Sequence, residues 1–361
     1  MKIGILGAGH GGLAMSADLK LMGHKVLLSA VEEHSLNLKL LKAMGSITID
    51  GVSCLGTGSI TTTADFVCDD IKETIEFGEI IFINVPAFAQ EDYNECICKY
   101  GKNGQIIVYP CGGFSALNFY NQLKRYNREK DFIVGETSSF IYTTKIIAPA
   151  KVLIKSIKDK VLFSSIKKED TIRALSVLNK IYPQFKPAQN IWQTSFNNPS
   201  SVLHTITTLL NMSRIEQFGS YKNSNFDITP SVARVMEKVD KERVEVAKHF
   251  YNKPMSVTEI MNSLYSLNHD NIYDVIMGIK AYKIQHSPAN MQHRYISEDI
   301  PYSLVPIATL AKKLDLKTPN MDSIINLACM CNDKDYWQEG RNADKIGFSK
   351  DMIEEREKVL I

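Results

Sequence analysis

Near the start of the chain, apolar residues form a continuous run, then recur at helical spacing, and then form a second continuous run. Lys2 to Leu6 is a short, almost continuous apolar run, which is typical of a buried strand. A glycine cluster follows, and apolar residues then recur at roughly helical spacing over residues 13–21. A second apolar run occupies residues 25–29. The pattern predicts a strand, a glycine turn, a helix and a second strand.

Short runs rich in Ile and Val continue through the first half and are bounded by polar residues or glycine. They occupy residues 79–85, 105–109 and 132–135. Because helix-like stretches separate them, they predict a mostly parallel sheet covered by helices. Two more runs, residues 152–157 and 161–165, predict a hairpin that extends this sheet, and a helix is expected over residues 169–181.

The second half of the chain has a different pattern. Strand signals fade after Pro183 and Pro187, and residues 230–250 carry one apolar stripe at helical spacing. The fold predicted is therefore an α/β domain over residues 1–187, followed by an all-helical domain over residues 188–361. We expect ligands in a cleft between the two domains, outside the carboxyl ends of the strands.

The glycine cluster, Gly7-Ala8-Gly9-His10-Gly11-Gly12, has the spacing of a dinucleotide-binding turn. In such a turn Gly7 allows the tight bend, Gly9 lets backbone approach a pyrophosphate, and Gly12 lets the helix pack closely on its strand. The amide groups and positive dipole end of the helix favour phosphate charge. This context predicts a Rossmann-type dinucleotide-binding domain, and a tight turn without a ligand is the alternative.

Composition narrows the class of protein. A chain of 361 residues fits about two domains, and 44% hydrophobic with 23% charged residues describes a globular protein. A net charge of +2 gives no electrostatic reason to expect nucleic acid or membrane as a partner, and no apolar run approaches the roughly twenty residues of a membrane span. Without a membrane span, we expect a cytoplasmic location. The seven cysteines lack CxxC spacing, so we expect reduced thiols and no metal site.

Side chains that can carry chemistry lie in two stretches of the helical half. In "NNPSSVLHTITTLLN", Asn198 is placed to cap a helix, and His204 lies off the apolar face, toward solvent or a cleft. In "HRYISEDIPYSLVP", Arg294 precedes Glu298 and Asp299. An Asp before proline is commonly a helix cap, and an arginine near two acids is often a surface ion pair. Spacing alone cannot show that these two stretches meet.

Taken together, these motifs resemble the octopine/nopaline (opine) dehydrogenase family. The resemblance covers nearly the whole chain and rests on the glycine fingerprint, "NNPSSVLHT", "KVDKERVEVAKHF" and "HRYISEDIPYSLVP", with "KTP" downstream. It implies that His204 is the general acid/base, that Asp299 pairs with it, and that Arg294 binds a substrate carboxylate. It also implies a reductive condensation, in which an amino acid adds to a 2-oxo acid such as pyruvate, water leaves, and NAD(P)H delivers hydride to the imine.

The implied roles agree with the chemistry of the side chains. An imidazole titrates near neutral pH, and a carboxylate on its other nitrogen fixes the tautomer and stabilises the imidazolium. The resemblance also places Val85 and Pro86 of "NVPAFAQ", and Glu136 of "GETSSFIYTTK", on the cofactor side, with His10 and Gly11 completing the fingerprint. We expect small-molecule substrates and a monomer or homodimer.

An acidic residue about twenty positions beyond the fingerprint normally binds the ribose hydroxyls of NAD. Counting from the last glycine reaches Glu32, with Glu33 beside it, and no arginine or lysine lies between the second predicted strand and Lys39. Two carboxylates would repel an added phosphate. The sequence therefore predicts NAD, with NADP as the alternative; an NADP site would draw on His34, Ser29 or Lys39.

Two other functions remain open at this point. One is a dehydrogenase of the ketopantoate reductase or glycerol-3-phosphate dehydrogenase type, which uses a lysine on its second domain. The best lysines for that role, Lys238 and Lys241, lie in a heavily charged helical stretch. The other is a nicotinamide-sensing protein without turnover, because fold does not imply function.

Overall fold

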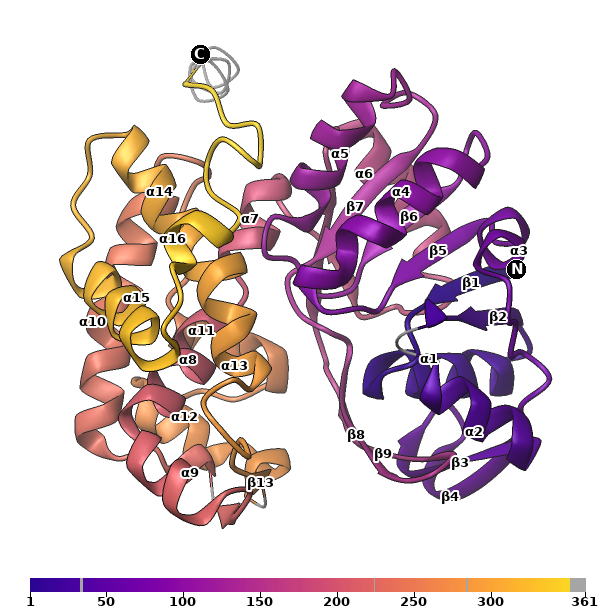
Figure 1. Cartoon of the computed structure of the whole chain (residues 1–361), viewed down its shortest axis with the longest axis horizontal. Helices are drawn as coiled ribbons and strands as arrows, with labels where there is room; N and C mark the ends of the chain where they lie inside the picture. Colours follow the sequence, from indigo (N-terminus) through magenta and orange to yellow (C-terminus); the bar gives the residue numbers. More distant parts are fainter. Residues whose placement is uncertain (33–34, 224, 284, 351–361) are drawn as a thin grey trace. The chain divides into compact units, whose positions relative to one another are not determined.

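The computed structural model describes residues 1–32, 35–223, 225–283 and 285–350. The chain separates into two compact units, Met1–Pro187 and Ala188–Ile361, so the division falls where the sequence predicts it (Figure 1).

The first unit is built on a large parallel sheet. Within the described residues, seven strands follow the order β11-β10-β7-β6-β5-β1-β2, and every neighbouring pair is parallel except β7 with β10. The strands are β1 Lys2–Leu6, β2 Lys25–Ser29, β5 Ile80–Ile83, β6 Ile106–Tyr109, β7 Ile133–Thr137, β10 Val161–Ser165 and β11 Phe185–Pro187. The predicted α/β class with a mostly parallel sheet is confirmed.

Helices connect the strands of this unit (Figure 1). They are α1 His10–Leu21, α2 Leu36–Met44, α3 Ile71–Phe77, α4 Gln90–Tyr100, α5 Ser115–Arg125 and α6 Lys168–Leu178. Among them, α1, α3, α5 and α6 pack on the large sheet. The chain builds outward from β1 to β2 on one side and to β5 on the other. The carboxyl ends of β1 and β5 therefore form the topological switch point, where open α/β sheets bind ligands.

The predicted hairpin between residues 152–157 and 161–165 is wrong. The first run belongs to β9 Lys151–Ile157, which joins a separate sheet, whereas the second is β10 of the large sheet. This separate sheet has the order β4-β3-β9-β8, with β3 Ser46–Ser53, β4 Gly56–Thr63 and β8 Tyr142–Ala148. Strands β3, β4 and β8 are rich in Thr, Ser and Gly, or their apolar and polar residues do not alternate regularly. They therefore lack the apolar run that marks a buried strand.

A buried carboxylate joins α1 to this second sheet. Asp18 on α1 is fully buried, and its side chain accepts hydrogen bonds from the Tyr142 hydroxyl at 2.7 Å and the Cys54 amide at 2.8 Å. The hydroxyls of Tyr142 and Tyr182 lie 3.0 Å apart. Burial raises the pKa of Tyr142 well above its ordinary value, so its phenol stays a neutral donor. The glycine-turn helix is thus fixed by both sheets.

The second unit is helical apart from two very short strands in the described residues. Its helices are α7 Ile191–Phe196, α8 Ser200–Leu210, α9 Met212–Phe218, α10 Pro230–Ala247, α11 Val257–Tyr265, α12 Ile272–Gly278, α13 Arg294–Ser297, α14 Val305–Lys313, α15 Pro319–Asn332, α16 Tyr336–Glu339 and the π-helix η5 Ile300–Leu304. The predicted all-helical domain is confirmed, although α10 ends three residues before the predicted end at residue 250.

A buried charge pair on α10 positions the segment that leads into α8. Arg243 is fully buried, and its Nε donates to Asp240 Oδ1 at 2.7 Å. The Arg243 guanidinium also donates to the backbone oxygens of Phe196 at 3.0 Å and Met255 at 2.6 Å. Charge-assisted bonds to backbone are among the stronger hydrogen bonds in a protein interior, so this arginine anchors the end of α7. The sequence pattern alone marked only the apolar stripe of this helix.

Two properties of the described ranges bear on function. None of their helices combines the length and apolar character needed to cross a bilayer. No group of three or more His, Cys, Asp or Glu side chains within them is arranged to hold a metal ion.

Candidate functional site

The glycine turn after β1 has the geometry that close approach of a phosphate requires. Gly7 has a φ of +105°, and a Cβ there would lie 2.5 Å from the Asn84 oxygen. A Cβ on Gly12 would lie 1.8 Å from the Gly7 oxygen, so the helix can approach the strand only with glycine at this position. Around Gly9, by contrast, no heavy atom lies within 4 Å of a Cβ position. The exposed Gly9 therefore leaves open space in front of the turn.

The first turn of α1 is suited to an anion. No side chain caps this helix, and its first turn carries no acidic residue. The positive end of the helix dipole therefore faces the open space at Gly9 without a protein carboxylate to neutralise it. His10 at the first position is exposed, and its Nδ1 accepts a hydrogen bond from the Ile146 amide at 2.9 Å, which ties the turn to β8. A dinucleotide pyrophosphate fits these residues.

Val85 and Pro86 follow β5 after one intervening residue, Asn84, and are partly buried, on the other side of the switch point from the glycine turn. Gly7 contacts this segment, because the Asn84 oxygen and the Val85 side chain would both meet a Cβ added at Gly7. The predicted cofactor residues of β1 and β5 are therefore neighbours in space.

Glu136 lies inside the unit rather than on its surface. It is in β7, which continues two residues beyond the predicted end, and it is fully buried. Its Oε2 accepts a hydrogen bond from the Ala116 amide in the first turn of α5 at 3.0 Å. A Cβ at Gly112 would come within 2.6 Å of Glu136 Oε1. The carboxylate thus fixes the β6–α5 loop at the carboxyl edge of the sheet.

Glu32 is exposed and forms an ion pair with Lys39, whose Nζ lies 2.6 Å from Glu32 Oε1. Both residues line a cavity of about 460 Å³ after β2, together with Lys42, which is paired with Asp69. Strand β2 spans Lys25–Ser29, which are the residues of the predicted apolar run. Each lysine of the cavity therefore has an acidic partner.

The sequence offered Ser29, His34 and Lys39 as alternatives for a phosphate site. Ser29 is fully buried and its hydroxyl donates to the Cys68 oxygen at 2.8 Å, so it is not available to a ligand. Glu33 and His34 lie outside the described residues.

In the helical unit the structure brings His204 and Asp299 together across the chain. His204 is in α8, which packs against α13 and η5 (Figure 1). The Nδ1 of His204 lies 2.8 Å from Asp299 Oδ2, and the two side chains are 22% and 11% exposed. An ionised carboxylate can only accept, so Nδ1 carries the proton in this pair. The other ring nitrogen, Nε2, takes no part in this contact.

The helix-cap alternative for Asp299 is wrong. Asp299 does precede η5, but its side chain makes no capping hydrogen bond there. Asn198, by contrast, does act at a helix start, because its Oδ1 accepts from the Ser200 amide at 3.1 Å. The Asp299 side chain contacts His204 instead.

Tyr295 is part of this cluster and was missed at the sequence level. Its ring stacks on the His204 ring, with centroids 3.8 Å apart and planes 16° apart. The spacing held a signal, since Tyr295 and Asp299 are four positions apart and residues so spaced lie on one face of a helix. Burial raises the pKa of the Tyr295 phenol to about 12, so it remains neutral at ordinary pH.

Arg294 precedes Tyr295 on α13. Its Nε lies 3.0 Å from Glu298 Oε2, and the arginine side chain is 55% exposed. The ion pair that the sequence left open is therefore present. This exposure lets a carboxylate reach the arginine side chain from solution.

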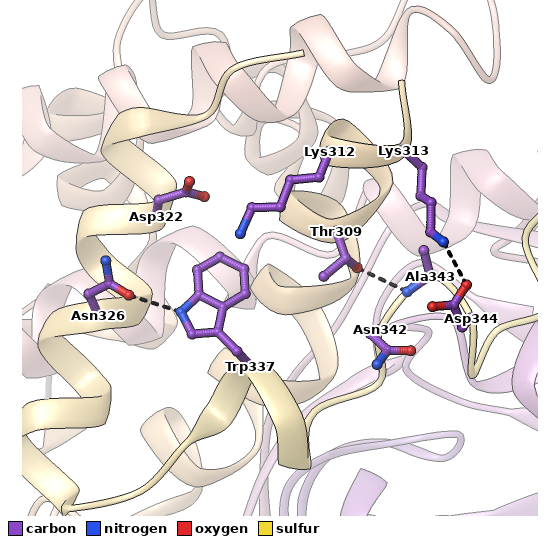
Figure 2. Close-up of a pocket in the computed structure, with 9 residues that line it drawn as sticks. All are labelled: Thr309, Lys312, Lys313, Asp322, Asn326, Trp337, Asn342, Ala343 and Asp344. Carbon is purple, nitrogen blue, oxygen red and sulfur yellow. Dashed lines mark hydrogen bonds and ion pairs between the residues drawn. The ribbon is translucent and has the colours of Figure 1, made fainter. Parts of the chain in front are cut away.

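A second cavity, of about 470 Å³, lies among α14, α15, α16 and the segment after α16 (Figure 2). Its side chains largely bind one another: Trp337 donates to Asn326 at 2.9 Å, and the Lys312 ammonium lies 3.6 Å from the Trp337 ring centroid. Lys313 pairs with Asp344 at 2.9 Å. It shares no lining residue with the His204 cluster, and none of its residues is a predicted site residue.

Comparison with known proteins identifies the family. The family profile described as NAD/NADP octopine/nopaline dehydrogenase, alpha-helical domain, matches residues 187–332. The curated opine dehydrogenase of Arthrobacter sp. (strain 1C) is 31% identical over 345 residues, which cover 96% of this chain and 94% of that protein. The chain belongs to the opine dehydrogenase family. It is accordingly a dehydrogenase that uses a nicotinamide dinucleotide, NAD or NADP.

Solved structures agree with this assignment at the level of the fold. An octopine dehydrogenase with NADH and pyruvate superimposes with a TM-score of 0.74 at 20% identity and covers 98% of this chain and 97% of its own. A yersinopine dehydrogenase with NADP+ has a TM-score of 0.70 at 14% identity, covering 98% of each chain. Membership in this family argues against the lysine-dependent alternative, and both candidate lysines, Lys238 and Lys241, are exposed on α10.

Proposed function

We propose that this opine dehydrogenase catalyses the reversible reductive condensation of an amino acid with a 2-oxo acid such as pyruvate, acting on the CH–NH bond of its product. The observation that carries the proposal is the 2.8 Å contact between His204 Nδ1 and Asp299 Oδ2. Further support comes from the octopine dehydrogenase structures, whose titles name L-arginine or pyruvate with NADH. A condensation of this kind requires several proton transfers near neutral pH, which an imidazole can perform.

In the proposed mechanism His204 moves the protons. Its Nε2 takes a proton from the substrate ammonium, because only the neutral amine can attack the carbonyl carbon. The imidazolium then returns a proton to the hydroxyl of the carbinolamine, so that water leaves and the imine forms. Asp299 stabilises the positive charge on the ring throughout and keeps the proton on Nδ1. In the reverse direction the same nitrogen performs these transfers in the opposite order.

Arg294 orients the substrate in this proposal. A guanidinium binds a carboxylate with two parallel hydrogen bonds, which fixes the direction of the attached carbon. Arg294 directly precedes Tyr295, whose ring stacks on His204, so the proposed carboxylate-binding residue and the proposed acid/base belong to segments that pack together. Its existing partner Glu298 holds the arginine side chain through Nε.

The residues proposed to hold the cofactor are Gly7, Gly9, His10, Gly11 and Gly12 at the turn, with Val85 and Pro86 after β5 and Glu136 near the carboxyl end of β7. Reduced nicotinamide supplies the hydride when it is bound. We further propose that the protein prefers NADH to NADPH. The cavity after β2 has two lysines matched by two acids, Glu32 and Asp69, so it offers no excess positive charge to an added phosphate.

A steady-state assay tests this function. NADH oxidation is followed with pyruvate and a mixture of amino acids, then with each substrate omitted. The proposal requires consumption of NADH only when both the oxo acid and an amino acid are present. NADH binding without consumption under every pairing would instead indicate a sensing protein, and reduction of an oxo acid alone would indicate a 2-hydroxy-acid dehydrogenase. We also propose that the enzyme is cytoplasmic. We further propose that it is a monomer or homodimer, and light scattering measures this oligomeric state.

A further inference from the structure

The His204 imidazole makes two contacts that control different degrees of freedom. Asp299 binds one ring nitrogen, which selects the tautomer but leaves the ring able to tilt about that hydrogen bond. The Tyr295 ring lies parallel to the imidazole, with centroids 3.8 Å and planes 16° apart, and so opposes any tilt. Rotation of the imidazole about its Cβ–Cγ bond would break both contacts together. The pair of contacts therefore selects a single orientation of the ring.

Tyr295 is itself held in place. The His293 Nδ1 accepts a hydrogen bond from the Tyr295 amide at 3.3 Å, which caps the start of α13. The edge of the His293 ring also meets the Tyr295 ring, with centroids 4.5 Å apart and planes at 81°. Asp299 follows Tyr295 by four residues, between the end of α13 at Ser297 and the start of η5 at Ile300, so one short stretch of chain presents both the stacking ring and the carboxylate. Any movement of this stretch carries both contacts with it.

We propose that Tyr295 is a positioning residue for the acid/base step: its ring face holds the His204 imidazole in the plane in which Nδ1 meets Asp299 and Nε2 meets the substrate. This inference rests on the proposed function. The tyrosine acts through its ring rather than through its hydroxyl. The electron-rich face of the ring also attracts a cation, so it favours the imidazolium that forms during the reaction.

Substitutions separate the ring from the hydroxyl. Tyr295→Phe keeps the stacking surface and should retain at least about a third of the wild-type kcat. Tyr295→Leu removes the ring and should lower kcat by roughly 10- to 100-fold, because misplacing a reacting group by about 1 Å can cost up to 100-fold. NADH affinity should not change in either variant. Tyr295→Met, whose flexible side chain fills space without a ring, replaces Tyr295→Leu if the leucine variant does not fold.

A spectroscopic measurement tests the stack without relying on catalysis. The Tyr295 ring current should shift the carbon-bound protons of His204 upfield in protein with labelled histidine, with His204→Gln identifying the signal among the eight histidines. Tyr295→Phe should keep this shift, and Tyr295→Leu should remove it. Trp337→Leu is the matched control, because it removes another ring of the helical unit, one that contacts Lys312 (Figure 2). The control should leave both the His204 signal and kcat unchanged.

Each outcome decides the proposal. If Tyr295→Phe loses as much activity as Tyr295→Leu, the hydroxyl acts directly and the positioning role is overturned. If Tyr295→Leu keeps the wild-type kcat although the upfield shift is lost, the stack has no role in the reaction. Failure of the proposed function is distinguishable from both, since the wild-type protein would then show the His204 shift but no condensation. Loss of kcat and of the shift in Tyr295→Leu, with both kept in Tyr295→Phe, supports the proposal.

Discussion

Replacing Asp299 by asparagine tests the pairing on which the proposed mechanism depends. The 2.8 Å contact with His204 has the length of a charge-assisted hydrogen bond, and the Asp299 side chain is only 11% exposed. Such bonds contribute about 1.5–3 kcal/mol, which corresponds to roughly 10- to 150-fold in rate when the charge they stabilise appears during the reaction. Asn can still hydrogen-bond, but it cannot stabilise the imidazolium. We therefore expect kcat to fall by that factor in Asp299→Asn.

His204→Ala sets the scale for this measurement. Removing a general acid/base typically costs about 10²- to 10⁴-fold, so the alanine variant should lose more than Asp299→Asn. NADH oxidation in the presence of pyruvate and the preferred amino acid gives kcat, and fluorescence titration gives NADH affinity, which should hardly change. Asp322→Asn is the control, since this carboxylate of the helical unit accepts from the Thr318 hydroxyl and lies outside the His204 cluster. The control should keep the wild-type kcat.

One result would refute the reasoning. If Asp299→Asn keeps kcat within twofold of wild type but lowers the melting temperature, Asp299 is a structural residue of the α13–η5 region. The absence of any capping bond from its side chain to η5 argues for the opposite result, a large loss of rate with little change in stability.

Three further predictions concern other residues. Arg294→Ala should raise the KM of one carboxylate substrate roughly 10- to 150-fold, for the bidentate contact it removes; unchanged KM values for both substrates would place Arg294 outside the site. Glu32→Ala should lower kcat/KM with NADH and so reduce the ratio of kcat/KM for NADH to that for NADPH; a wild-type preference for NADPH would contradict the role of Glu32. Tyr142→Phe should destabilise the protein by about 1–3 kcal/mol at pH 8, because the buried Asp18 loses a donor. Since the pKa of Tyr142 is raised on folding, its contribution to the free energy of unfolding is present below pH 10 and lost above it. Urea unfolding at pH 8 and 10.5 should therefore show a smaller loss of stability in Tyr142→Phe than in the wild type, by up to about 1.4 kcal/mol per pH unit.

Features set by neighbouring residues could be predicted from the chain. The parallel strands followed from short apolar runs, and the glycine turn followed from the spacing of Gly7, Gly9 and Gly12, although the close contact of Gly7 with Asn84 appears only in the folded sheet. The start of α8 and the division after residue 187 were likewise marked by local changes in composition. The combination of motifs was also enough to identify the family, although no single one of them was.

Strand pairing was decided by the tertiary structure. The run at residues 152–157 carries the same apolar signal whichever partner it takes, and the turn before it, with Ala150 at a φ of +50°, pairs it with β8 instead of β10. The weakly apolar β3 and β4 complete that sheet, and only the packed α1 with its buried Asp18 shows what they cover. Pairing depends on contacts that a one-dimensional pattern does not contain.

The site divides in the same way. The sequence supplied His204, Asp299 and Arg294 as residue types suited to proton transfer and carboxylate binding, and it left a surface histidine, a helix cap and a surface ion pair open as alternatives. The packing of α8 on α13 and η5 set the 2.8 Å contact, added the Tyr295 ring, and left the Asp299 side chain without a capping bond. Sequence fixes which side chains a segment presents, whereas the contact that turns an imidazole into an oriented acid/base forms only when helices distant in the chain pack together.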